Sequence, residues 1–312
     1  MLRITADLFS GRPNPVWEVQ DEARVRETLR SLRQHEDLLS EGVPAGSGLG
    51  FRGFEIESSS DELTLGVGYA SSVYLPVGRT ARGARANEFA EQLIDLLYRD
   101  ATAVAPPSEL PPLETPIQEL LTAELQWAAS QGGAASLSDA SGQAEQPAQQ
   151  PAAPAVTCTI EVAPYNPGFW NDNATTRRCN NCYNYASNWR TNDFAQPGLG
   201  CGSVYQSLSC DAVTRAALCD GMHHRYDCFP DSEKPRWLVA LAVGPGYDYH
   251  WYRLMKEGFW GHKPGGTNVR NVDERNRQIT DPQTADRGRY THFCGYFYSC
   301  KTQQQRIRGY GC

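Results

Sequence analysis

The sequence predicts a mixed α+β protein with two folded parts and a connecting segment. Its 312 residues suffice for two ordinary domains with cores of their own. The first hundred residues alternate between strand-like and helix-like segments. All ten cysteines follow Thr157, after a stretch of Ala, Gln, Ser, Gly and Pro that cannot bury enough surface to order itself. We therefore expect a small N-terminal α+β domain over residues 1–105, a linker over 106–157 and a cysteine-rich α+β domain over 158–312.

In the N-terminal part, alternation and helical spacing define the expected elements. Leu2–Phe9 alternates like a strand, and Ser10–Pro15 is dense in turn-forming residues. Val25, Leu29 and Leu32 recur at helical spacing, and Asn87 stands where a cap would begin a second amphipathic helix. The sequence thus predicts strands over residues 2–9, 51–56 and 63–75, and helices over 21–33 and from Asn87 to about Leu97.

The motif Phe9-Ser-Gly-Arg-Pro-Asn-Pro-x-Trp17 resembles the opening of many small uncharacterised bacterial domains. This resemblance implies a bacterial protein, but it brings no activity with it and names no partner for the N-terminal domain. Arg12 and Asn14 could bind a ligand, but a rigid turn between a strand and Trp17 is the simpler interpretation.

The linker contains one helical pattern, from Pro116 to Ala129, in which Ile117, Leu120, Leu121 and Leu125 share a face. This helix could dock on either domain. Residues 130–156 are expected to be flexible.

The C-terminal part combines a short helix with apolar strands. A helix is expected from Cys182 to about Trp189, and strands over residues 237–243, 249–254, from Gly258 and over 290–299. Between them lies a cysteine-rich insert, from Gly200 to Asp231, with Cys201, Cys210, Cys219 and Cys228 at intervals of nine residues.

This cysteine content predicts disulfides and an oxidising location, although their pairing cannot be read from the sequence. If Cys182 is free, one more thiol must be unpaired or pair between chains. The N-terminus does not read as a signal peptide, because Asp7 interrupts it. We expect an extracellular protein, or one exported by another route, while a cytoplasmic location with reduced cysteines stays open. No segment reaches the length of a membrane span.

Charge is unevenly distributed between the two parts. From Cys158 onward there are 18 basic and 14 acidic residues, against 11 basic and 22 acidic residues before it. Opposite net charges fit two domains that attract each other, or a basic half that meets an acidic surface. Without a long basic run, nucleic acid is not an expected partner.

Cys182 is the candidate nucleophile. At the start of a helix, unpaired backbone N–H groups can lower the pKa of a thiol and hold an oxyanion. Because nine other cysteines are present, a disulfide at Cys182 is the competing interpretation. On the strand Tyr249–Leu254, alternation places His250 and Tyr252 on one face and Tyr249 and Trp251 on the other.

The segment Asn181-Cys182-Tyr-Asn-Tyr-Ala resembles the nucleophile motif of the CHAP and NlpC/P60 cysteine peptidases and amidases. The resemblance covers roughly residues 165–300 and implies a papain-like domain with a nucleophile helix on an antiparallel sheet. It implies Cys182 as nucleophile, His250 as base and His262 as the orienting residue. It departs from the family in lacking Gly-His at the base strand and in having the cysteine-rich insert.

Further candidates fill supporting roles. Asn181, Asp248 and Asn271 are candidates for oxyanion or orienting groups, and a substrate groove could be lined by Trp170, Trp189, Trp251 and Trp260. Cys179-x-x-Cys182 and the pair His223-His224 raise the alternative of structural zinc, but only one close-spaced pair is present. We therefore expect neither a metal nor a cofactor.

Two functions follow from these patterns. The first is a cysteine hydrolase that cleaves an amide bond in peptidoglycan peptides or other peptides. The second is a non-enzymatic, disulfide-stapled secreted module, because the stretch from Tyr249 to Lys263-Pro-Gly also resembles a segment of shell extracellular matrix proteins.

Overall fold

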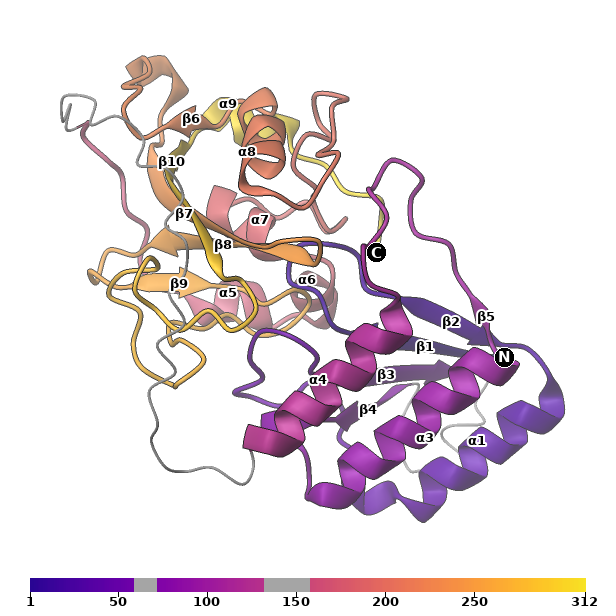
Figure 1. The fold of residues 1–312 in the computed structure, drawn as a ribbon. Coiled ribbons are helices and arrows are strands. Elements are labelled where there is room, and N and C mark those ends of the chain that lie inside the picture. Colours follow the sequence, from indigo (N-terminus) through magenta and orange to yellow (C-terminus); the bar gives the residue numbers. More distant parts are fainter. Residues whose placement is uncertain (59–71, 132–157) are drawn as a thin grey trace.

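The structure is a computed structural model that describes residues 1–58, 72–131 and 158–312. It confirms a mixed α+β protein with two antiparallel sheets (Figure 1). Residues 63–71 of the strand expected over 63–75 lie outside the described residues, and so do residues 132–156 of the flexible stretch expected over 130–156.

The N-terminal sheet has five strands in the order β4-β3-β1-β2-β5. They are β1 (Leu2–Asp7), β2 (Val16–Val19), β3 (Gly53–Ser58), β4 (Ser72–Pro76) and β5 (Thr102–Ala103). Strands β1 and β3 pair along their whole length, so that Ile4 lies opposite Ile56. The short strands β2 and β5 were not expected from the sequence, because each offers too few residues for a clear alternation.

Three helices cover one face of this sheet, side by side in Figure 1: α1 (Glu22–Gln34), α3 (Ala84–Asp100) and α4 (Ile117–Gln131). Asp21 caps α1 by accepting a hydrogen bond from the Arg24 backbone N–H. The expectation that Asn87 caps its helix was wrong. Helix α3 begins a turn earlier, after Gly83, and the Asn87 side chain accepts a hydrogen bond from the Gly78 N–H.

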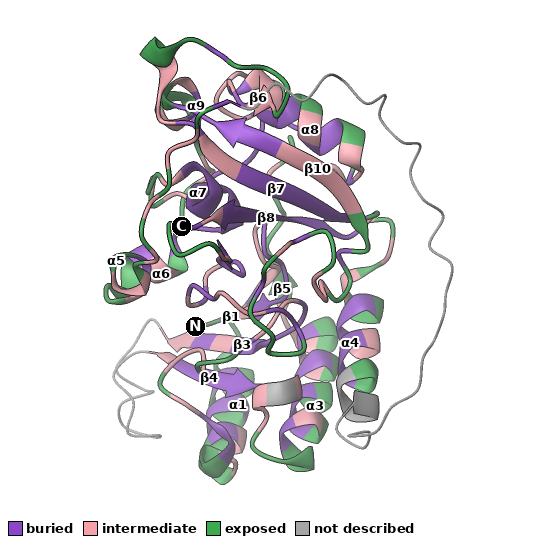
Figure 2. Ribbon diagram, turned by 90° about the vertical axis from the view of Figure 1, so that its left-hand side faces the viewer, coloured by how far each residue is buried: buried purple, intermediate pink, exposed green. Residues whose placement is uncertain are grey.

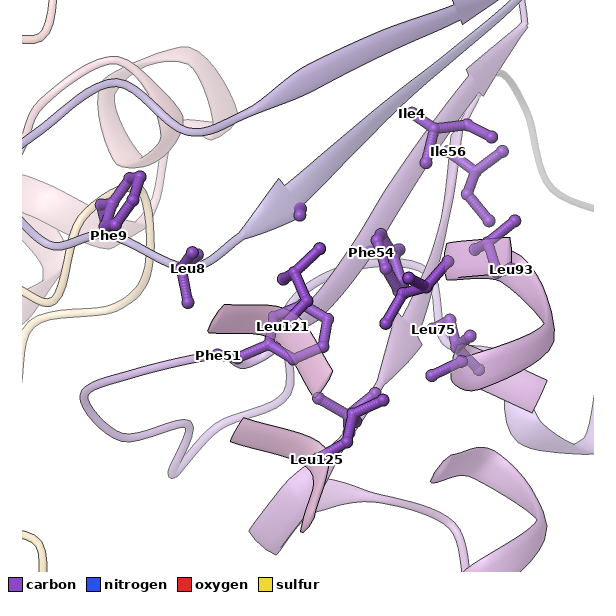
Figure 3. Close-up of a cluster of buried hydrophobic side chains, with 14 of the residues drawn as sticks. Ile4, Leu8, Phe9, Phe51, Phe54, Ile56, Leu75, Leu93, Leu121 and Leu125 are labelled. Carbon is purple, nitrogen blue, oxygen red and sulfur yellow. The ribbon is translucent and has the colours of Figure 1, made fainter. Parts of the chain in front are cut away.

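The core forms where the inward residues of the strands meet these helices. Figure 3 shows Ile4, Ile56 and Leu75 of the sheet facing Leu93 of α3 and Leu121 of α4. Helix α4, the expected linker helix, thus docks on the N-terminal part. Burying each such leucine or isoleucine contributes about 2 kcal/mol.

The C-terminal sheet has the order β6-β10-β7-β8-β9. Its strands are β6 (His223–His224), β7 (Trp237–Gly244), β8 (Asp248–Leu254), β9 (Trp260–His262) and β10 (His292–Ser299). Short helices surround it: α5 (Pro167–Asn171), α6 (Ala174–Arg178), α7 (Cys182–Ser187), α8 (Cys210–Cys219) and α9 (Lys301–Arg306), with the 3-10 turn η3 (Asp231–Glu233). Helix α8 forms inside the cysteine-rich insert, where no helix was expected from the sequence.

One of the hydrophobic clusters extends across both parts. The cluster around β1, β3, α3 and α4 continues into the C-terminal sheet through Ala242, Tyr252, Trp260 and Tyr290. The central strands β7 and β8 are buried along most of their length, whereas β10 is only partly buried (Figure 2). The C-terminal part also has a cluster of its own, which includes Val213, Leu241 and Trp251.

Ion pairs also cross the boundary in the direction expected from the charges. Arg178 lies 2.7 Å from Glu57, and Arg289 is ion-paired with the buried Glu124 of α4. In each pair the arginine belongs to the C-terminal part, and the glutamate belongs to the N-terminal part or to α4, which docks on it.

Candidate functional site

The helix that carries Cys182 is fixed by its N-cap, Asn181. The Asn181 side chain accepts hydrogen bonds from the N–H groups of Tyr183 and Asn184, and the Asn184 side chain accepts one from the Asn181 N–H in a capping box. The amide nitrogen of Asn181 donates to the carbonyls of Gly11 and Ala195, at 2.9 and 2.7 Å. Because both amide hydrogens are used in this way, Asn181 is not placed as an oxyanion donor.

The Cys182 thiol is a core group. The residue is completely buried, and its Sγ donates to the backbone carbonyl of Tyr249 at 3.9 Å. Burial raises the pKa of this thiol well above its usual value, and the nearby Asp248 carboxylate raises it further. A nucleophile requires a lowered pKa and access to substrate, so Cys182 has the opposite of both properties.

His250 and the Cys182 helix belong to opposite faces of β8. Helix α7 packs on the face formed by Tyr249 and Trp251, within a cluster that contains Cys182. The His250 ring contacts Tyr252 and Tyr290, which lie on the other face. The alternation predicted from the sequence is thus confirmed, but the histidine face is the one turned away from α7.

The two candidate histidines bond to each other. His250 Nε2 lies 2.8 Å from His262 Nδ1, and His262 Nε2 lies 3.0 Å from the carbonyl oxygen of Val272. Since a carbonyl only accepts, His262 must carry its proton on Nε2, and His250 Nε2 is then the donor to His262 Nδ1. Burial lowers the pKa of both rings, for His262 to about 3. The pair is therefore a neutral, buried hydrogen-bond chain.

Asp248 binds the N-terminal part. Its carboxylate accepts hydrogen bonds from the backbone N–H groups of Ser10, Gly11 and Arg12, at 2.5 to 3.3 Å, and from the Tyr290 hydroxyl at 2.7 Å. The loop Ser10–Pro15, whose sequence predicted a rigid turn, thus presents consecutive N–H groups to an anion. We expected Asp248 to orient a histidine, but its carboxylate instead holds the loop Ser10–Pro15.

The same loop inserts into the C-terminal part at Gly11. The Gly11 carbonyl accepts hydrogen bonds from Asn181, Gln196 and the Tyr249 hydroxyl. A Cβ atom on Gly11 would overlap the Tyr249 ring, so only glycine fits here. Asn14 braces the turn by accepting bonds from the N–H groups of Leu8 and Phe9. We call residues Ser10–Pro15 the plug loop.

The remaining predicted residues do not converge on one site. Asn271 lies in the loop after β9, where its backbone carbonyl accepts a hydrogen bond from Ile279 N–H. Trp170, Trp251 and Trp260 are buried at 5% exposure or less, whereas Trp189 is 48% exposed. Three of the four tryptophans proposed for a substrate groove are therefore core residues.

Eight of the ten cysteines form disulfides: Cys158–Cys228, Cys179–Cys312, Cys201–Cys219 and Cys210–Cys294. Cys182 and Cys300 are free and buried. This confirms the expectation that a second thiol accompanies an unpaired Cys182. Because Cys179 bonds to Cys312, the Cys179-x-x-Cys182 pair does not act as a unit.

The structure brings together three side chains that can bind a metal and that the sequence did not connect. His223, Glu233 and Cys300 place their ligand atoms within 4.8 Å of one another. Cys219 and Cys228, which lie near His223 in the sequence, are both in disulfides with other cysteines. Nothing in the sequence pattern ties Glu233 or Cys300 to His223.

The structure also contains a cavity of about 1050 Å³ beside the N-terminal sheet. Strands β1 and β2, the proline-rich segment before α4 and the C-terminal residues Tyr310–Cys312 line it. Its wall carries charges of both signs, including Arg3, Glu57 and Arg178.

The chain is similar to the "Insoluble matrix shell protein 1" of Ruditapes philippinarum. The two are 45% identical over 139 residues, which are 45% of this chain and 89% of that protein. No family model matches the chain. No solved structure matches it either.

This relative overturns two expectations. A hydrolase and a bacterial protein were expected, whereas the match is to a matrix protein of a mollusc. The geometry gives the physical reason, since Cys182 is buried and faces away from His250. The relative and the four disulfides together indicate an extracellular protein. Among the described residues, no helix is long and apolar enough to cross a membrane.

Proposed function

The chain belongs to the same family as the insoluble matrix shell protein of Ruditapes philippinarum, and from this we propose that it is a non-enzymatic structural module of an extracellular matrix. The 45% identity over nearly the whole relative is the observation that carries the proposal. The binding partner is then a matrix component and not a peptide to be cleaved.

The covalent framework supports this function. The disulfides Cys179–Cys312 and Cys210–Cys294 join segments 133 and 84 residues apart. A disulfide that closes a loop of this length removes conformations from the unfolded chain and thereby stabilises the fold by about 4–5 kcal/mol. A protein that remains folded in an extracellular matrix, without chaperones, benefits from such cross-links.

The chemistry of the free thiol supports it as well. A hydrolase would use Cys182 as a thiolate within reach of an imidazole. Here burial disfavours the thiolate, and the pair of His250 and His262 is engaged in its own hydrogen bonds on the other face of β8. We propose that the papain-like arrangement expected for residues 158–312 serves as a scaffold only, with Cys182 as part of its core.

We further propose that residues 1–105 and 158–312, although distinct in the sequence, fold as one unit. The contacts between Asp248 and the plug loop support this proposal. Without the loop, the buried Asp248 carboxylate would lose its N–H partners, and the fold of residues 158–312 would be strongly destabilised. The N-terminal part then has a structural role in addition to any binding role.

The cavity beside β1 and β2 is the surface we propose for the matrix component. Its volume is close to the upper end of the range for ligand-binding clefts. The exposed Arg3 of β1 stands on its wall, beside apolar residues such as Val104 and Pro107, so the cavity suits a partner with both charged and apolar groups.

Sedimentation with shell matrix tests this function. The purified, disulfide-intact protein is mixed with the washed insoluble matrix of Ruditapes philippinarum shell and centrifuged. We expect the protein in the pellet, and Arg3→Glu to lower the bound fraction. Arg26→Glu is the matched control, because Arg26 is equally charged and exposed on α1, away from the cavity. Protein that stays in the supernatant would contradict the function, and equal binding by both variants would contradict the cavity as the site.

A further inference from the structure

Three side chains of different chemistry lie together at the β6 edge of the C-terminal sheet, away from the cavity. His223 comes from β6, Glu233 ends η3, and Cys300 is the N-cap of α9. His223 Nε2 lies 3.4 Å from Glu233 Oε2, and Cys300 Sγ lies 3.7 Å from the same oxygen. All three ligand atoms lie within 4.8 Å of one another.

The fold holds these three segments together. Strand β6 pairs with β10, so that His223 lies opposite Tyr298, two residues before Cys300. Arg236 forms an ion pair with Asp231 at the start of η3, and the Cys158–Cys228 disulfide fixes the chain just before it. The site is therefore built on a strand pair and a cross-linked turn.

Two of the three separations between ligand atoms fit a tetrahedral zinc site. Zinc binds nitrogen at about 2.0–2.1 Å, carboxylate oxygen at about 2.0–2.2 Å and sulfur at about 2.3 Å. At a tetrahedral angle these lengths place N and O about 3.4 Å apart, and S and O about 3.6 Å apart. The observed separations of 3.4 and 3.7 Å therefore need little adjustment.

Two further residues orient the ligands. His223 Nδ1 lies 3.0 Å from Asp227 Oδ2, which leaves Nε2 as the nitrogen that faces Glu233 and Cys300. The Thr302 hydroxyl donates to Glu233 Oε2 at 2.9 Å. A carboxylate on the far nitrogen of a histidine is the usual outer partner of a metal-bound imidazole, since it fixes the tautomer and the ring orientation.

The donor set selects the metal. A thiolate and an imidazole favour zinc and copper over calcium, which prefers six to eight oxygen ligands. Cys300 is completely buried, so a disulfide to another chain is sterically disfavoured. His223 and Glu233 are partly exposed, with side-chain exposures of 21% and 32%, and give an ion a path to the thiol.

We propose that His223 Nε2, a Glu233 carboxylate oxygen and the Cys300 thiolate bind one zinc ion, with water as the fourth ligand. The Cys300 proton passes to solvent when the ion binds, and no electrons are transferred. This site is independent of the matrix-binding function, because it lies in a different part of the molecule.

Equilibrium dialysis of the disulfide-intact protein against zinc chloride, followed by elemental analysis, tests the site. We expect one zinc per chain, and a thiolate-to-metal charge-transfer band when cobalt replaces zinc. Cys300→Ser and Glu233→Gln should abolish the band, and Asp227→Asn should weaken zinc binding about 10- to 100-fold. Calcium chloride at the same concentration should not compete.

His224→Gln is the matched control, because His224 is the neighbour of His223 on β6 and its ring stacks on Tyr226. It should bind zinc like the unchanged protein. Far-UV circular dichroism of each variant separates loss of metal from loss of fold. Absence of bound zinc in the folded, unchanged protein, or full retention of the cobalt band in folded Cys300→Ser, would overturn the assignment.

Discussion

The Cys182 thiol and the His250 ring lie on opposite faces of strand β8. The thiol bonds to the Tyr249 carbonyl and packs with Trp251, whereas the imidazole contacts Tyr252 and Tyr290. A rotation of one side chain cannot bring the two together, because the strand itself separates them. The chain therefore has the residues of a cysteine hydrolase without their arrangement.

The contact between Asp248 and the plug loop should be a major source of stability. Asp248→Asn keeps the size of the side chain but removes the charge that three backbone N–H groups and Tyr290 surround. We expect a loss of about 3 kcal/mol or more in the free energy of unfolding, measured by urea denaturation. Asp211→Asn, at an exposed position, should change it by less than about 0.5 kcal/mol.

The plug loop should also be intolerant of a single methyl group at Gly11. In Gly11→Ala the new Cβ would overlap the Tyr249 ring, so the loop or the ring must move. We expect destabilisation of about 1–3 kcal/mol. Gly42→Ala is the control, because its Cβ would have no neighbour closer than 4.0 Å. Equal melting temperatures for the two variants would show that the loop is not tightly held.

The buried histidine pair should make the protein acid-sensitive. The pKa values of His250 and His262 are lowered in the folded state, and both rings gain protons near pH 6.5 when the chain unfolds. Their contribution to stability is thus complete above about pH 6.5 and is lost as the pH falls towards 3, the folded-state value for His262.

Between about pH 6 and pH 4, each histidine should lower the free energy of unfolding by about 1.4 kcal/mol per pH unit. Urea denaturation across this range should therefore show a shallower slope for His250→Leu than for the unchanged protein. His292→Gln, which removes an exposed histidine at the start of β10, is the control. An unchanged slope in His250→Leu would argue against a neutral, buried pair.

The disulfides should differ in their contribution according to loop length. Cys179–Cys312 joins residues 133 apart, and Cys201–Cys219 joins residues 18 apart. Removing the first by double substitution with serine should cost about 5 kcal/mol, and removing the second about 3 kcal/mol. Chemical denaturation of the two double variants measures the difference. The reverse order would mean that local contacts outweigh chain entropy.

Several of the longer helices and strands were predictable from the sequence, and the long-range contacts were not. A continuous apolar run identified β7, and alternation along β8 placed His250 and Tyr249 on opposite faces. It could not say which face meets α7, since both faces of β8 are buried and carry aromatic residues. The hydrolase interpretation rested on that undetermined choice.

The plug loop shows the same limit. Its turn residues correctly indicated a rigid loop, but its partner Asp248 is 238 residues away from Ser10 in the sequence. The disulfide pairing and the convergence of His223 with Glu233 and Cys300 likewise depend on how distant segments such as β6 and β10 pair. No local pattern carries that information.

The reactivity of the free thiols in the native protein tests the central claim most directly. The disulfide-intact, metal-free protein is treated with iodoacetamide at neutral pH, and the labelled cysteines are identified by mass spectrometry. We predict that Cys182 is unreactive until the protein is unfolded in guanidinium chloride, when both Cys182 and Cys300 become labelled. Rapid labelling of Cys182 in the folded protein, abolished by His250→Leu, would contradict the account and restore the hydrolase.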